Sequence, residues 1–385
     1  MILGLDIGGT KTAVVLGTSA GEILWRKQFA TAPLRGFMPV YDELLSTAKE
    51  ALSAAASFLP GASAAKDTPR EKRSAPRATA YTPGMELLRA KTADVSGAGA
   101  TAGSGDVSAD STLSNNLSNT LTINAERLRA LAEPVECIGV SIGGPMDSLT
   151  GVIKSPPNLP HWDNIPLKEM LASAFSLPVY VEHDGNAGAL AEWYFGAGKG
   201  YTNLVFITMG TGFGAGLILD GRLFRGTSNT AGEIGHIRIA EDGPKCFGKA
   251  GSLEGYGSGT GMVLLAQAMY PLRYNSTVTV KELYTDFTNN SEEAAAVFQR
   301  AGMYVGRGLA MIADMINPQC IILGGLGMRI GDAIVEPLLT AFNQEALKES
   351  AEACRIVPAQ LGESIGDIAA LSAALYQKNF WQKNN

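Results

Sequence analysis

The architecture of this chain can be read from one stretch, Val181-Glu-His-Asp-Gly-Asn-Ala-Gly-Ala-Leu-Ala-Glu192. An apolar, strand-like run, Leu177–Val181, precedes it, and the Ala/Leu/Glu-rich end of the stretch has helical propensity. Asp184 is therefore expected where a strand passes into a helix. A carboxylate there is stabilised by the helix N-terminus, and strand ends are where α/β proteins build active sites. Asp184 is either a helix cap or a functional acid, and the glycine-rich sequences on both sides favour the functional acid.

Composition limits the classes of protein to consider. The chain has 385 residues, 46% hydrophobic and 18% charged, which suits a soluble globular protein long enough for two domains. A net charge of -6 argues against a nucleic-acid partner. Asp6 interrupts the apolar start and no run of about 18 apolar residues follows, so neither a signal peptide nor a membrane span is expected. Four scattered cysteines indicate reduced thiols and a cytoplasmic location.

The N-terminus predicts a glycine-tipped hairpin. Two β-type runs, ending at Asp6 and beginning at Thr12, flank the turn Gly8-Gly9. The Walker phosphate loop does not fit, because Thr10 precedes Lys11 and a strand follows instead of a helix. Backbone N–H groups at such a tip can hold phosphate oxygens, although an ordinary tight turn is the alternative.

A second hairpin of this kind is predicted further along. The strand Asn203–Met209 leads into Gly210-Thr-Gly-Phe-Gly-Ala-Gly216, and the strand Leu217–Asp220 follows. A nicotinamide cofactor is rejected, because the dinucleotide fingerprint requires strand then helix. Two glycine hairpins suggest that backbone N–H groups at both tips bind one polyphosphate. A third glycine loop, Gly324-Gly-Leu-Gly327, follows the buried strand Cys320–Leu323.

The remaining segments alternate between helix, strand and loop. Residues 60–120 are rich in Ala, Ser, Thr, Gly and Asn and read as a surface insertion, largely disordered, with a short helix near 85–90. Glu233 and His236 can point into one pocket, although a lone histidine is more often structural. The other predicted elements are helices at 41–59, 125–131, 167–175, 302–316, 333–347 and 366–378, a strand at 135–140, and a proline-rich loop at 155–162.

Six motifs in order give the chain a resemblance to the ROK sugar kinases. The phosphate and adenosine motifs are Asp6-Ile-Gly-Gly-Thr-Lys11, Gly210–Gly216 and Ile322-Leu-Gly-Gly325; the sugar-side motifs are Pro157-Asn-Leu-Pro-His-Trp162, Asp184-Gly-Asn-Ala187 and Glu233-Ile-Gly-His236. The resemblance implies an α/β, actin-like and ribonuclease-H-like ATPase fold with two lobes around a nucleotide and sugar cleft. We expect lobes at 1–140 and 141–365, with a C-terminal helix at 366–385 returning to the first.

The resemblance also implies a function: ATP-dependent phosphorylation of the 6-hydroxyl of a hexose, with glucose expected. An N-acetylhexosamine kinase and a catalytically weak sugar-sensing regulator are the alternatives. Asp184 would be the general base, and Asp6 would hold Mg²⁺ through water. The implied sugar contacts are Gly144, Asn158, His183, Asp184, Glu233, His236 and Glu254. The implied ATP contacts are Asp6, Gly8, Gly9, Thr10, Lys11, Gly210, Thr211, Gly212, Gly214, Gly324 and Gly325.

The resemblance further implies a homodimer. Repressors of the family carry a DNA-binding segment ahead of the first phosphate loop, and because that loop begins at Asp6 we expect the kinase branch. Two departures stand out. His183 replaces the Asn that often precedes the catalytic Asp, and the three cysteine positions of the family's zinc motif hold Lys245, Phe247 and Ser252. With Cys246 in a spacer, we expect no zinc and a loop held by packing instead.

Overall fold

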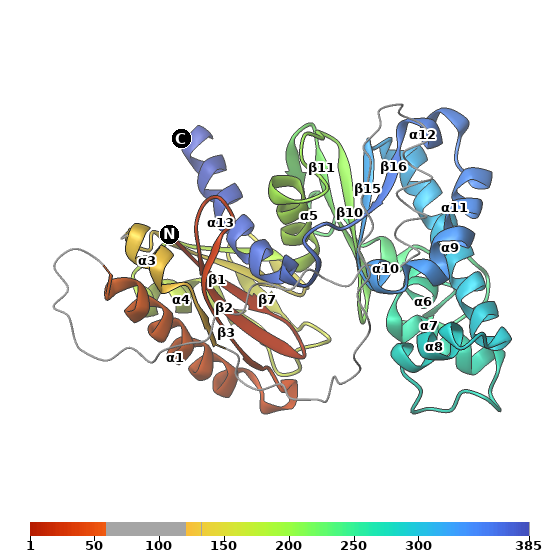
Figure 1. Ribbon diagram of the computed structural model, residues 1–385, viewed down its shortest axis with the longest axis horizontal. Coiled ribbons are helices and arrows are strands. Elements are labelled where there is room, and N and C mark those ends of the chain that lie inside the picture. Colours follow the sequence, from red (N-terminus) through yellow and green to blue (C-terminus); the bar gives the residue numbers. More distant parts are fainter. Residues whose placement is uncertain (59–120, 132, 385) are drawn as a thin grey trace.

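The computed structural model describes residues 1–58, 121–131 and 133–384, which form two lobes, each built on one mixed β-sheet. The two sheets stand side by side with helices between and outside them (Figure 1). The predicted insertion at 60–120, with its helix at 85–90, lies outside the described residues.

The first sheet has the strand order β4-β3-β2-β1-β5-β9. β1 is antiparallel to β2 and parallel to β5, which is in turn parallel to β9. Ile7, Ile142 and His183 are in register at the carboxyl ends of the parallel strands, so the segments that follow them emerge side by side. The strands are β1 (Ile2–Ile7), β2 (Lys11–Gly17), β3 (Ile23–Ala30), β4 (Leu121–Ile123), β5 (Cys137–Ile142) and β9 (Val179–His183).

The second sheet repeats this arrangement in the order β12-β11-β10-β15-β16. β10 is antiparallel to β11 and parallel to β15, as β1 is to β2 and β5. The β1–β2 and β10–β11 hairpins therefore occupy equivalent places in the two lobes. The strands are β10 (Leu204–Met209), β11 (Phe213–Leu219), β12 (Arg222–Phe224), β15 (Cys320–Gly325) and β16 (Arg355–Pro358).

Two helices, α5 (Asp184–Phe195) and α13 (Ile365–Asn384), cross between the lobes. α5 follows the last strand of the first sheet but packs on β10 and β11, whereas α13 follows the last strand of the second sheet and packs on β1, β5 and β9. The two helices also pack against each other (Figure 1). Both are Ala-rich, and residues 185–192 and 368–374 are buried on every side, as expected of helices enclosed by two sheets.

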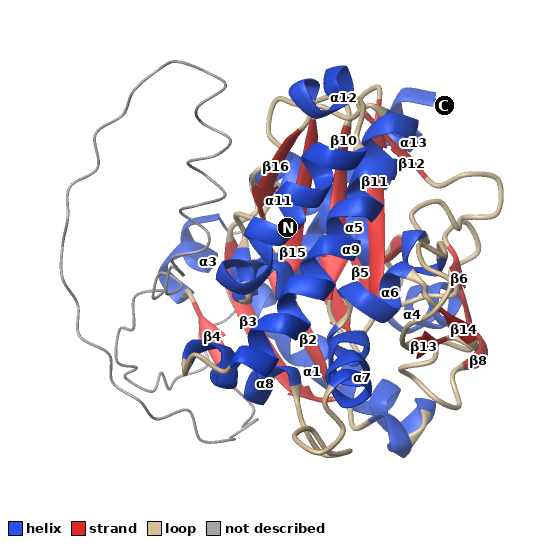
Figure 2. Ribbon diagram, turned by 90° about the vertical axis from the view of Figure 1, so that its right-hand side faces the viewer, coloured by secondary structure: helices blue, strands red, loops and turns tan. Residues whose placement is uncertain are grey.

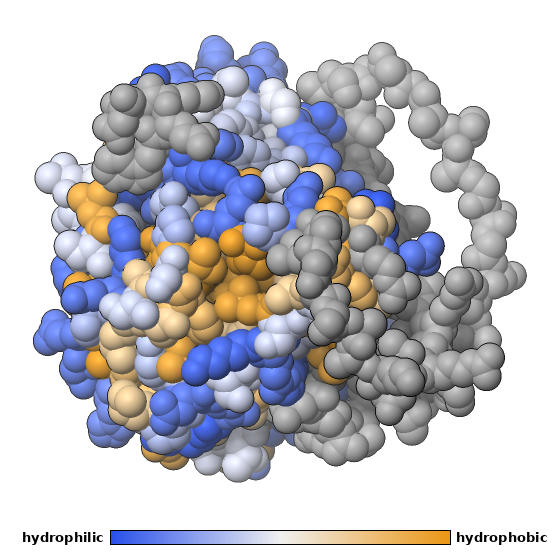
Figure 3. Space-filling view, turned by 90° about the vertical axis from the view of Figure 1, so that its left-hand side faces the viewer, coloured by the Kyte–Doolittle hydropathy of each residue, from blue (hydrophilic) through white to orange (hydrophobic). Residues whose placement is uncertain are grey.

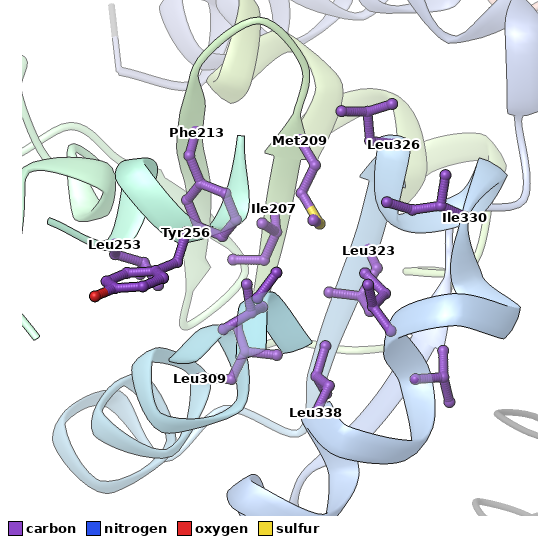
Figure 4. Close-up of a cluster of buried hydrophobic side chains, with 14 of the residues drawn as sticks. Ile207, Met209, Phe213, Leu253, Tyr256, Leu309, Leu323, Leu326, Ile330 and Leu338 are labelled. Atoms are coloured by element: carbon purple, nitrogen blue, oxygen red, sulfur yellow. The ribbon is translucent and has the colours of Figure 1, made fainter. Parts of the chain in front are cut away.

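The outer face of each lobe is closed by further helices. α1 (Phe37–Ala56) covers the first sheet, and Figure 2 shows α9 (Glu292–Ile316) and α11 (Gly331–Glu345) across the second. The core beneath them joins Ile207 and Met209 of β10 to Leu309 of α9 and Leu338 of α11 (Figure 4). The other helices are α3 (Ala125–Leu131), α4 (Leu167–Phe175), α6 (Leu253–Gly257), α7 (Gly259–Met269), α8 (Val280–Thr288), α10 (Leu326–Arg329) and α12 (Lys348–Ala353).

The structure differs from the sequence expectations in three places. The expected lobe boundary after residue 140 is wrong, because β9 pairs with β5 in the first sheet. The expected proline-rich loop at 155–162 is confirmed, but it connects two strands of a small antiparallel sheet that was not predicted, made of β6 (Met146–Asp147), β7 (Val152–Lys154) and β8 (Asp163–Pro166). β15 runs through Gly325 directly into α10, so the third glycine loop is a strand-to-helix junction.

In the described parts of the chain, no helix combines the length and the apolar character needed to cross a membrane. On the side of the first lobe that faces away from the second, apolar residues gather at the centre of the surface, with hydrophilic residues above and below them in this view (Figure 3).

Candidate functional site

The tip of the β1–β2 hairpin is fixed by hydrogen bonds within the first lobe. The Gly8 N–H closes the turn on the Lys11 carbonyl at 3.0 Å. The Thr31 hydroxyl donates to the Gly8 carbonyl at 2.6 Å, and its oxygen lies 2.8 Å from the Thr12 hydroxyl. Thr31 was not predicted from the sequence, because it reaches the turn from the end of β3.

The same tip lies against the sugar-side loop. A side-chain carbon placed on Gly9 would stand 2.8 Å from the Asn158 carbonyl oxygen. Glycine is therefore required by close approach of two backbones. Two segments about 150 residues apart, one predicted for phosphate and one for sugar, thus meet at this point.

Asp6 stands at the centre of an acidic cluster. Burial raises its pKa to about 7, with further contributions from the nearby carboxylates of Asp367 and Asp184; Lys11 and the Ser141 hydroxyl oppose the shift. Gly366, in the first turn of α13, packs directly on the Asp6 carboxylate. The predicted base and the predicted magnesium residue therefore share one electrostatic environment.

Asp367 was not predicted from the sequence. Its carboxylate accepts a hydrogen bond of 2.7 Å from Arg26 Nε, and Arg26 also donates to Gln28. Burial raises the pKa of Asp367, while Arg26 lowers it. The pair fixes the start of α13 against β3, next to Asp6.

Asp184 lies at the junction of β9 and α5, as predicted. The N-cap of α5 is His183, whose Nδ1 accepts from the Gly185 N–H at 3.3 Å, so Asp184 itself is the first residue of the helix. One Asp184 oxygen accepts from the same N–H at 2.7 Å, and the side chain is 52% exposed. The other oxygen faces Gly143, and a side-chain carbon on Gly144 would stand 2.9 Å from His183 Nε2. The loop after β5 thus lines the same site as Asp184.

The β10–β11 hairpin is tied to the predicted sugar residues. Its turn is closed by the Gly210 N–H on the Gly212 carbonyl at 2.9 Å, so the tip is shorter than expected and Gly214 lies within β11. The Phe213 N–H donates to Glu254 Oε2 at 3.1 Å. Burial raises the pKa of Glu254 in this position.

Glu254, His236 and Glu233, three of the predicted sugar residues, lie close enough to interact with one another. Glu233 Oε2 lies 3.9 Å from His236 Nε2, and the side chains of both residues are about half exposed. The pKa of Glu254, raised mainly by burial, is also influenced by both neighbours. The first turn of α5 packs against the second sheet. A side-chain carbon placed on Gly185 would stand 3.1 Å from the Ala215 carbonyl oxygen.

A buried ion pair lies directly behind Asp184. Arg225, which follows β12, donates to Glu182 Oε2 of β9 through Nε at 3.1 Å and Nη2 at 2.5 Å. Asn186 of α5 donates to the other Glu182 oxygen at 3.0 Å, and Gln377 of α13 also contacts Glu182. This cluster, with the Glu182 side chain only 1% exposed, joins both sheets and both crossing helices.

A cavity of about 750 Å³ adjoins the second hairpin. It lies at the carboxyl ends of β10 and β15, where α/β folds bind nucleotides. The predicted Gly324 and Gly325 do not line it; Gly325, at a φ of 61°, instead turns the chain into α10, which supplies part of the wall. The lining residues are Gly210, Thr211, Gly259, Thr260, Val263, Leu264, Gln267, Ser276, Thr279, Val280, Leu326 and Arg329.

The residues present do not fit the family's structural zinc. Cys246 is buried, and at the zinc-motif positions the Phe247 ring contacts the His236 ring at a tilt while the Ser252 hydroxyl caps α6. One thiol and one imidazole fall short of four ligands. In the described residues no three acidic, His or Cys side chains are placed to hold a metal ion, so a magnesium ion at Asp6 would need water and phosphate for most of its ligands.

Comparison with known proteins gives a consistent picture. The model of the ROK family matches residues 103–378, more than half of the chain. A glucokinase from Halalkalibacterium halodurans is 32% identical over 264 residues, covering 65% of this chain and 80% of the relative. A xylose repressor from Bacillus subtilis is 29% identical over 229 residues, covering 59% of this chain and 58% of the repressor.

Solved structures agree. The ROK hexokinase from Thermus thermophilus has a TM-score of 0.69 at 26% identity, covering 98% of this chain and 99% of its own. A ROK glucokinase from Streptomyces griseus, solved with glucose and AMPPNP, has a TM-score of 0.64 at 24% identity, covering 98% of this chain and 99% of its own. The predicted actin-like, ribonuclease-H-like fold is thereby confirmed.

Proposed function

The chain belongs to the ROK family, and on that premise we propose that it is an ATP-dependent hexose kinase acting on the 6-hydroxyl of glucose. The observation that carries this proposal is that the Asp6 and Asp184 carboxylates interact electrostatically and that each lies beside one hairpin. Asp6 is in β1, and Gly185, next to Asp184, packs on Ala215 of β11. A phosphoryl transfer site needs phosphate donors, a cation residue and an acceptor base within one cleft.

The two hairpin tips would hold the β- and γ-phosphates through backbone N–H groups, and the cavity beside α10 would take the adenosine. Because these donors are fixed by the turn bonds and by Thr31, they require little reorganisation during the reaction. Asp6, through water, would hold Mg²⁺, which neutralises charge on the phosphates when bound.

Asp184 would act on the acceptor. Its carboxylate would take the proton of the sugar hydroxyl while that oxygen forms a bond to the γ-phosphorus and the bond from the γ-phosphorus to the leaving ADP oxygen breaks. The Asp184 oxygen beside Gly143 would be the one that accepts this proton, because the other oxygen accepts from the Gly185 N–H. Glu233, His236 and Glu254 would bind other hydroxyls, with Asn158, His183 and Gly144 nearby.

A specific observation favours one second candidate. Xylose repressors are among the relatives, and His183 departs from the family's usual Asn, so a sugar-sensing regulator with weak catalysis is the alternative. The phosphate hairpins and Asp184 favour the kinase. If the protein is a kinase, an N-acetylhexosamine is the alternative substrate to glucose. We propose a homodimer on the basis of the family alone.

One experiment separates these functions. The purified protein is given Mg·ATP with glucose, mannose, N-acetylglucosamine, N-acetylmannosamine or xylose, and ADP release is followed with and without each sugar. We expect ADP release that depends on glucose. Release with only an N-acetylhexosamine would change the substrate, and sugar binding without any release would identify the regulator.

A further inference from the structure

The β13–β14 hairpin (Lys245–Cys246 and Lys249–Ala250) presents a phenylalanine in an unfavourable conformation. Phe247 and Gly248 form its turn with φ angles of 47° and 72°. Such turns favour Asn, Asp or Gly, and a bulky residue at positive φ is strained. The Phe247 side chain is also 59% exposed, so burial does not compensate for the strain.

What the Phe247 ring contacts is His236. The ring centroids are 5.0 Å apart with an interplanar angle of 47°, within the range of attractive aromatic pairs. From the same hairpin, Lys249 Nζ donates to the His236 carbonyl at 2.5 Å. His236 is therefore held at its ring and at its backbone by one short element.

The hairpin has a firm base. The Ser252 hydroxyl accepts from the Gly255 N–H at 3.3 Å, and Ser252 forms a β-bridge with Arg238. The Tyr256 hydroxyl donates to the Asp242 carbonyl at 2.9 Å. These contacts join the hairpin to α6, which carries Glu254, so Phe247 is fixed relative to two of the proposed sugar residues.

We propose that Phe247 is a positioning residue: with Lys249 it orients the His236 imidazole toward the sugar, so that this loop works without a bound metal. The inference rests on the proposed function for the identity of the ligand. It accounts for the strain, because the residue best suited to the turn could not support the histidine.

The test compares Phe247→Asn with Phe247→Tyr and with Phe224→Ala, which removes another exposed ring, on β12 (48% exposed against 59% for Phe247). We expect Phe247→Asn to raise the KM for glucose by about three- to tenfold, the scale of one misplaced hydrogen bond, with little change in the KM for ATP. Phe247→Tyr, which keeps the ring, and Phe224→Ala should behave as the wild type. An unchanged glucose KM in Phe247→Asn would overturn the proposal.

Stability separates positioning from a structural role. Asn tolerates positive φ, so Phe247→Asn should unfold at the same temperature as the wild type or higher. A lower unfolding temperature with equal rises in both KM values would show a structural role and overturn the proposal. Dialysis of the wild type against a chelator should leave the glucose KM unchanged; a zinc-dependent KM would also overturn it.

A readout independent of activity distinguishes this inference from the proposed function. The chain has three histidines, so the ring signals in a ¹H–¹³C spectrum can be assigned with His161→Gln and His236→Gln. Loss of the Phe247 ring current should move the His236 signals in Phe247→Asn and not in Phe224→Ala; unmoved signals refute the inference. Absence of sugar-dependent ADP release in the wild type would instead refute the proposed function.

Discussion

At the start of α5, Asp184 keeps one carboxylate oxygen on the Gly185 N–H and leaves the other beside Gly143. Asp184→Asn preserves this shape but cannot accept a proton. We expect turnover to fall by about a hundredfold or more, with the KM for ATP little changed. Steady-state kinetics with glucose and ATP provide the measurement. Near-normal turnover would assign the base to another group.

Asp6 gives a pH-dependent prediction about stability. Its pKa is raised from 3.8 to about 7 by burial and by Asp367 and Asp184, so the folded state binds a proton that the unfolded state has already lost between these values. Folding stability therefore falls as pH rises from about 4 to 7, and the loss is complete above 7.

Asp6→Asn removes this loss. In the ligand-free protein it should raise the unfolding temperature at pH 8, and the gain should shrink toward zero as pH falls to 4. Thermal unfolding across this range is the measurement, with Glu336→Gln on the exposed face of α11 as the control. The variant should nevertheless lose kinase activity. A gain that does not change with pH would contradict the assignment.

At the scale of elements, the Glu182–Arg225 pair joins β9 to the segment after β12. Arg225→Met leaves a buried carboxylate without its cation, which costs about 3–5 kcal/mol, whereas removing both charges is often close to neutral. We therefore expect the double variant Glu182→Gln/Arg225→Met to recover most of the stability lost in Arg225→Met. Urea unfolding of the wild type, of Glu182→Gln, of Arg225→Met and of the double variant measures this coupling. Additive losses of stability would refute it.

Elements were predictable where the local pattern was strong. α4 was predicted to the residue because an amphipathic run stands between Pro166 and the left-handed Ser176. The two glycine hairpins were predicted because β-type runs flank them. The short polar strands β6–β8 were not, since they have no apolar alternation, and the lobe of β9 was misassigned because sequence does not reveal which sheet a strand joins.

Among the site residues too, those in a local sequence pattern were predictable and those with distant partners were not. The glycines and Asp184 stand out as motifs in the sequence. Arg26, Asp367 and Arg225 do not, because their partners are distant in the chain: Arg26 and Asp367 are 341 residues apart. Such residues become visible only when the fold brings them together.

At the scale of the whole molecule, the exchange of α5 and α13 makes each sheet depend on the other lobe's chain. The first sheet buries its inner face on α13, and a side chain on Gly139 would collide with the backbone of Ala370. Neither core is complete without both crossing helices. We therefore expect one calorimetric transition whose van't Hoff and measured enthalpies agree. Two separate transitions would show that the lobes unfold independently.

Each crossing helix begins at one of the two acids proposed for catalysis: Asp184 is the first residue of α5, and Asp6 touches Gly366 in the first turn of α13. If the lobes rotate about these helices when substrates bind, the hairpin tips and the loop at 155–162 move furthest. Both carboxylates move least, because they lie near the rotation axis. The two lobes could then close on ligands of different size while the two carboxylates keep nearly the same positions.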